Sequence, residues 1–148
     1  MFVHILFTWL LANLLHPLLL ALAIYLPEGD TGFFSVAEFI SVLIQVSFYS
    51  LIISLPCLFL GWGLLYVIVS TKDIILVKFI EWLFASAMLI VLELMGIIFL
   101  VDDSVEMEHL LFTLPAIGAT WIAIAIRYKQ FRNLIGEHKT NDPESDPV

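Results

Sequence analysis

The sequence has little charge. Asp, Glu, Lys and Arg make up only 14% of the 148 residues, against roughly 25% in an ordinary soluble domain. Hydrophobic residues make up 61%, so too few polar groups remain to cover the surface of a soluble domain. Disorder over most of the chain is also excluded, because disordered segments have low hydrophobicity. The composition therefore predicts a polytopic membrane protein.

The sequence also lacks the common signatures of enzymes. A single cysteine, Cys57, excludes an internal disulfide and a C-x-x-C redox pair. Gly-rich phosphate loops, H-E-x-x-H and G-x-S-x-G do not occur. We interpret Ser41, Ser47, Ser50 and Ser54 as hydrogen-bonding residues of a membrane helix, none of them paired with a base. With a net charge of −8, nucleic-acid binding is disfavoured as well, and we expect no catalytic residue and no cofactor.

Four apolar runs predict an all-α fold. They cover residues 2–26, 36–70, 74–101 and 109–128, and each is long enough for the ~30 Å hydrocarbon core at about 1.5 Å per residue. The second run is long for one crossing, and Pro56 near its centre removes a backbone donor. We interpret it as one helix kinked at Pro56, because 57–69 alone is too short to span. The expected fold is an antiparallel four-helix membrane bundle over 1–135, followed by a disordered acidic tail over 136–148.

The first run has a second interpretation. The segment Ala21-Leu22-Ala23 resembles the small-residue site at which a signal peptide is cleaved. Against cleavage, no Lys or Arg precedes the apolar run, and the run is longer than a usual signal sequence. We therefore expect a transmembrane helix.

Basic residues are confined to two regions of the chain. They form an expected inner-surface basic group of Lys72, Lys78, Arg127, Lys129 and Arg132, with Lys139 in the tail. Because cytoplasmic loops carry the excess of Lys and Arg, we expect the second connection and both termini to be cytoplasmic, in an inner membrane. The segment 127–135 mixes basic and apolar residues. It is expected to rest on the anionic inner leaflet, or alternatively to dock a partner.

The first and third connections are acidic instead. They carry an expected outer acidic cluster of Glu28, Asp30, Asp102, Asp103, Glu106 and Glu108. Such oxygen ligands suit Ca²⁺ or Mg²⁺, but the spacing matches no defined loop, so no metal site is predicted. We interpret these residues as solvating the loops and favouring the N-terminus of the last helix.

Each expected helix carries a polar residue at a similar depth. Counted from the outer helix ends at 1.5 Å per residue, the four residues lie about 12 to 16 Å inside the membrane; they are His16, Gln45, Glu93 and Thr120. Helical spacing groups Trp9, Asn13, His16 and Leu20 on one face of the first helix, Glu38, Ser41, Gln45 and Tyr49 on the second, and Trp82, Ser86, Leu89 and Glu93 on the third. The pattern predicts an intramembrane polar layer of Asn13, His16, Gln45, Glu93 and Thr120.

This layer allows two interpretations. Buried polar groups hold membrane helices together by hydrogen bonds, and intramembrane Glu and His also mark proton or cation pathways. A haem is disfavoured, because His4, His16 and His109 share no depth.

Three hypotheses for the function follow. The leading one is a non-enzymatic integral membrane protein, an accessory subunit or immunity-type partner of another membrane protein. The second is a small transporter or channel subunit that moves protons or cations through Glu93 and His16. A membrane-embedded enzyme is third, since no catalytic group is identified. The expected partners are the lipid bilayer and another membrane protein, or a second copy.

Overall fold

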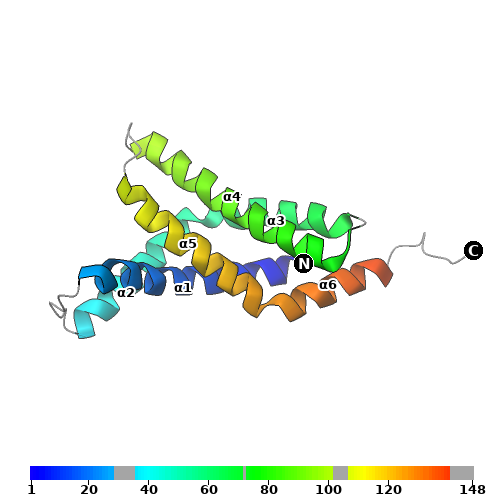
Figure 1. Ribbon diagram of the computed structural model, residues 1–148, viewed down its shortest axis with the longest axis horizontal. Helices are drawn as coiled ribbons and strands as arrows, with labels where there is room; N and C mark the ends of the chain where they lie inside the picture. The colour runs from blue at the N-terminus through cyan, green and yellow to red at the C-terminus, as the bar shows by residue number, and fades with distance from the viewer. Residues whose placement is uncertain (29–35, 72, 102–106, 141–148) are drawn as a thin grey trace, which may run out of the picture.

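A computed structural model of the chain describes residues 1–28, 36–71, 73–101 and 107–140. Within these ranges the chain is helical and contains no strand, which confirms the all-α expectation. The helices are α1 (Phe2–Glu28), α2 (Val36–Ile53), α3 (Leu55–Ser70), α4 (Ile75–Val101), α5 (Met107–Ile126) and α6 (Tyr128–Thr140). Figure 1 shows that the N-terminus, the connection from α3 to α4 and α6 lie at one end of the molecule.

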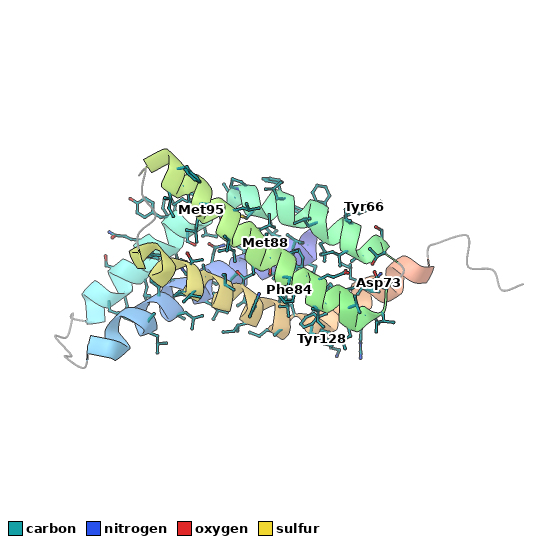
Figure 2. The ribbon with its side chains drawn as sticks, turned by 45° about the horizontal axis from the view of Figure 1, so that its top comes forward. Tyr66, Asp73, Phe84, Met88, Met95 and Tyr128 are labelled. Atoms are coloured by element: carbon teal, nitrogen blue, oxygen red, sulfur yellow. The ribbon has the colours of Figure 1, made fainter. Side chains whose placement is uncertain are left out.

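Two helices are long and apolar enough to cross a membrane, over Phe2–Ala23 in α1 and Ile75–Phe99 in α4. Helices α2 and α3 pass the same test as a bent pair, and α5 contains a shorter apolar segment, Phe112–Ile126. Large apolar side chains are exposed along these helices. Phe84 and Met88 on α4, for example, are 65% and 61% exposed (Figure 2). Because exposed apolar surface is unfavourable in water by about 25 cal/mol per Å² but matches lipid tails, the structure is consistent with a membrane protein.

The second apolar run is divided between α2 and α3. The two helices meet at Ser54 and are bent by 54° relative to each other, as Figure 1 shows. The bend lies just before Pro56, which occupies the first turn of α3. A proline is tolerated at that position because the first N–H groups of a helix have no intrahelical acceptor. The continuous helix kinked at Pro56 that we expected is therefore a pair of helices with its break at Ser54.

Helix α5 packs along α1 over most of its length. The contact uses small residues, since Ala119 and Ala123 are fully buried, and Gly118 lies against Leu19 of α1. Small side chains allow two membrane helices to approach closely. The α1–α5 pair thus forms one side of the molecule, and the α3–α4 pair forms the other.

Helix α6 continues beyond α5 after a bend at Arg127 and packs against other helices (Figure 1). Its Phe131 and Ile135 are almost completely buried, in an apolar cluster with Ile5, Leu65 and Val69. The apolar side of α6 is therefore covered by α1 and α3, and by Phe79 of α4, whose ring lies 5.8 Å from that of Phe131. We expected lipid at this surface. The helix continues to Thr140, past the expected end of the folded domain at residue 135. The rest of the expected tail, 141–148, lies outside the described residues.

Candidate functional site: a cavity between the helices

A cavity of about 440 Å³ lies between the helices. Side chains from α1, α2, α3, α4 and α5 contribute to its wall. Much of that wall is apolar, and the polar or aromatic hydrogen-bonding residues in it are Thr8, Trp9, Asn13, His16, Tyr49, Ser50, Ser54, Cys57, Trp82, Ser86, Glu93 and Thr120. This volume falls within the range of ~300–1,000 Å³ that is usual for small-molecule sites.

The cavity brings together four of the five residues expected in the polar layer. Asn13, His16, Glu93 and Thr120 all line it. Gln45 does not. The face of α2 that lines the cavity carries Val46, Tyr49, Ser50 and Ile53, and Gln45 lies outside this face and is exposed. Thr120 uses its hydroxyl within its own helix, donating to the Ala116 carbonyl oxygen at 2.9 Å. Of the expected layer, Asn13, His16 and Glu93 therefore remain as candidates for contact with a ligand.

Asn13 connects α1 to the bend between α2 and α3. The Ser50 hydroxyl donates to Asn13 Oδ1 at 2.6 Å, and the Ser54 hydroxyl lies 3.2 Å from the same oxygen. On its other side, the Asn13 amide donates to the Trp9 carbonyl oxygen at 2.9 Å. The Trp9 indole N–H in turn donates to Ser54 Oγ at 2.9 Å. These hydrogen bonds hold the first helix against the break in the second apolar run.

His16 joins this network through Ser50. Its Nδ1 lies 3.3 Å from Ser50 Oγ. Ser50 has one hydroxyl hydrogen, and the shorter contact assigns that hydrogen to Asn13 Oδ1. The histidine must then donate from Nδ1, which leaves Nε2 of the neutral ring as an acceptor. Nε2 is buried, and no described residue meets the distance and angle limits of a hydrogen bond to it; the backbone of Phe112 lies beside the ring.

The serines were the part of the site that the sequence did not reveal. We interpreted Ser50 and Ser54 only as hydrogen-bonding residues of a membrane helix, and the contact of Ser50 Oγ with His16 Nδ1 at 3.3 Å was not foreseen. Their four-residue spacing, which matches that of Trp9 and Asn13 on α1, is the one signal that pointed to a shared face.

The α4 wall of the cavity carries two more polar atoms without partners. Glu93 Oε1 and Trp82 Nε1 are buried, and no described residue hydrogen-bonds to either atom. Ser86, on the same face, donates to the Leu83 carbonyl oxygen at 2.8 Å. Most buried polar atoms in proteins are hydrogen-bonded. Among the described residues, Glu93 Oε1, Trp82 Nε1 and His16 Nε2 are exceptions, and all three belong to residues that line the cavity.

The expected inner-surface basic group does not form one surface. Lys78 is 1% exposed and donates from Nζ to the Val69 carbonyl oxygen at 2.6 Å, at the C-terminal end of α3. The Arg127 guanidinium lies over the ring of Phe7, 5.4 Å from its centroid. Lys129 and Arg132 are exposed on α6, and Lys72 lies outside the described residues.

The expected outer acidic cluster cannot be placed. Asp30, Asp102, Asp103 and Glu106 lie outside the described residues, as do the side chains of Glu28 and Glu108. In the part of the chain that the structure describes, no three His, Cys, Asp or Glu side chains are grouped as metal ligands.

Comparison of the chain with protein families, with curated proteins and with solved structures finds no significant match. The class is therefore defined by the fold and the cavity alone. The described chain is all-α, with helices suited to a membrane and a partly open cavity between them. Three residues of the cavity wall carry buried polar atoms to which no described residue hydrogen-bonds.

Proposed function

We propose that this chain is an antiparallel four-helix bundle of the inner membrane, with both termini in the cytoplasm, and that it acts without enzymatic activity as a partner of another membrane protein. An accessory subunit and an immunity-type protein both fit this role. The crossings are α1, the bent pair of α2 and α3, α4, and α5. The orientation is supported by the basic residues in and next to α6, a helix that lies at the same end of the molecule as the N-terminus (Figure 1).

The observation that carries the proposed partner role is an exposed face of α2 that combines polar and apolar side chains. Ser41, Gln45, Phe48 and Ile52 follow the 4-3-4 spacing of one helix face, and all four are exposed. We call these residues the bare face of α2. Within the part of the chain that the structure describes, α2 packs mainly against α1 and α3, and the side chains of the bare face remain exposed.

Gln45 makes the bare face unsuited to lipid. It lies about 13 Å beyond the start of α2 at 1.5 Å per residue, a depth at which no water is present to hydrogen-bond its amide. Polar side chains at such depth usually face another helix. A transmembrane helix of a partner would bury Phe48 and Ile52 and accept a hydrogen bond from Gln45.

Photocrosslinking in native membranes tests this role. A photoreactive phenylalanine analogue replaces Phe48 on the bare face or, as the matched control, Phe84 on α4; the two side chains are 60% and 65% exposed. We expect a protein adduct from position 48 and only lipid adducts from position 84. Gln45→Leu should lower the adduct yield about threefold, which corresponds to the ~0.6 kcal/mol average of a membrane hydrogen bond, and Met88→Leu should leave it unchanged.

Two results would overturn the partner role. An adduct with the mass of two copies of this chain would replace it by self-association. Equal yields from positions 48 and 84 would show that the bare face simply contacts lipid.

The cavity favours transport as a second candidate function, because it places Glu93 and His16 in one wall, each with an unpartnered polar atom. In proteoliposomes, a transporter of protons or cations should give a flux that Glu93→Gln reduces at least tenfold. Glu81→Gln, on the same helix but not in the cavity wall, is the control and should retain the flux. A wild-type flux equal to that of protein-free liposomes would exclude this function.

A further inference from the structure

The shape of the cavity along α4 indicates an elongated ligand. Trp82 and Glu93 both line it, and their separation along the helix corresponds to about 16 Å at 1.5 Å per residue. A volume of about 440 Å³ distributed over such a length is narrow. Between the two residues, α4 contributes Leu89 and Ile90 to the wall, together with Ser86, whose hydroxyl bonds to a carbonyl oxygen of its own helix. This shape suits a single hydrocarbon chain better than a compact ring system.

The polar atoms indicate where the ligand's head group lies. Glu93 Oε1 and His16 Nε2 are buried without partners. Both residues line the cavity, and a rotation of either side chain brings its covered polar atom to a ligand there. Asn13, Ser50 and Ser54 instead bond to one another. A buried polar atom that lacks its hydrogen bond destabilises a structure by about 1–3 kcal/mol. A bound hydroxyl could donate to one of the two free atoms and so relieve part of that penalty.

We propose that the cavity binds one single-chain amphiphile, a long-chain alcohol or a molecule with an equivalent hydroxyl head group. The head-group hydroxyl donates its one hydrogen to His16 Nε2 and accepts a hydrogen from the protonated Glu93 carboxyl, and the hydrocarbon tail extends along α4 toward Trp82. The site is independent of the proposed partner role, because the bare face of α2 does not contribute to the cavity wall. Ligand binding and crosslinking at Phe48 can therefore succeed or fail separately.

An ω-bromo fatty alcohol tests the site, because bromine quenches tryptophan fluorescence on contact. The full chain is placed in lipid nanodiscs and titrated with the probe. Trp62 and Trp121 are exposed and should show quenching that rises linearly with probe dissolved in the bilayer. The tail end of the cavity should add a saturable component at one probe per chain. Trp9 and Trp82 both line the cavity, so Trp82→Phe should reduce that component and Trp9→Phe with Trp82→Phe should remove it, whereas Trp121→Phe should leave it unchanged.

Variants at the other end of the cavity test the head group. Glu93→Leu and His16→Leu should each weaken saturable binding about tenfold, and Glu81→Leu should leave it unchanged. The matching ω-bromoalkane, which lacks the hydroxyl, should bind the wild-type chain at least tenfold more weakly than the alcohol. Ala116→Leu, which adds volume to the cavity wall, should reduce binding of the alcohol while circular dichroism shows that the chain stays folded.

Three outcomes would overturn the proposal. Quenching that is linear throughout would show that the probe dissolves only in lipid. Saturable binding of alcohol and alkane with equal affinity would remove the role of the head group. Saturable binding that Trp82→Phe and Ala116→Leu leave unchanged would place the probe outside the cavity.

Discussion

At the scale of single residues, the cavity wall combines two kinds of polar group. Asn13, Ser50 and Ser54 have their hydrogen bonds within the protein, and their role is to hold α1 against the bend. Glu93 and His16 each have one buried polar atom to which no described residue hydrogen-bonds, and we propose that these two residues bind the ligand of the cavity. Helical spacing predicted the inward direction of Asn13, His16 and Glu93, but it could not separate these two kinds of group, which depends on distances between helices.

Asn13 provides a prediction for the structural network. Asn13→Ala removes the acceptor of the Ser50 hydroxyl and the donor to the Trp9 carbonyl oxygen. Because membrane hydrogen bonds contribute on average ~0.6 kcal/mol each, and at most ~1.7, we expect a loss of about 1–2 kcal/mol in the free energy of unfolding. Denaturation in mixed micelles, followed by circular dichroism, measures this loss. Asn133→Ala, at an exposed position on α6, is the control, and an equal loss there would contradict the role of Asn13.

Lys78 provides a second prediction at this scale. Its side chain is buried, and Nζ donates to the Val69 carbonyl oxygen at the C-terminal end of α3, where a positive charge is favourable. Lys78→Ala leaves a cavity and removes that hydrogen bond, so we expect a loss of about 2–4 kcal/mol in the free energy of unfolding. Lys129→Ala is the exposed control and should change it by less than about 0.5 kcal/mol. A loss below 1 kcal/mol for Lys78→Ala would show that the end of α3 tolerates an uncapped carbonyl.

At the scale of helices, α2 and α6 differ most from the expectations. The stripe of Ser41 and Gln45 was expected to face the interior, but it is exposed. In a helix that is apolar all round, only the polar residues indicate which face meets another helix. They do not indicate whether that helix belongs to the same chain or to a partner. The amphipathic pattern of α6 likewise predicts an apolar side without identifying what covers it.

Helix α6 provides a prediction for its own docking. Phe131 is fully buried against α1 and α3, and a buried Phe→Ala change typically weakens packing by about 3–5 kcal/mol. Phe131→Ala should therefore release α6 and raise the rate of trypsin cleavage at Lys129 and Arg132 at least tenfold. Inside-out vesicles expose this end to the protease if the proposed orientation holds. Asn133→Ala, on the exposed side, should not change the rate, and unchanged cleavage of Phe131→Ala would indicate that lipid, not the bundle, holds α6.

At the scale of the whole molecule, hydrophobic length and sided charge argue for a membrane bundle. The described basic residues outside the interior, Arg127, Lys129 and Arg132, lie in or next to α6 at the end that holds the N-terminus (Figure 1). Loops rich in Lys and Arg remain in the cytoplasm. The same charges set the proposed orientation of every crossing.

Labelling of single cysteines tests that orientation. In a Cys57→Ser background, Asp73→Cys lies in the connection between α3 and α4, and Ser104→Cys lies in the acidic third connection of the sequence. A membrane-impermeant maleimide added to intact cells should label position 104 and not position 73, and inside-out vesicles should give the reverse. Labelling of both positions from one side would exclude an odd number of crossings between them and overturn the proposed topology.

Composition and periodicity by themselves determined that the chain is helical and apolar enough for a membrane, and which faces of α1 and α4 carry polar groups. These properties depend on residues close together in the chain, where helical geometry relates spacing directly to direction. The tertiary structure decided the rest. The break at Ser54 sets the direction of α3, and close packing of α5 on α1 closes one side of the cavity. Whether a polar atom is left without a partner depends on separations between helices, which spacing along a single helix does not determine.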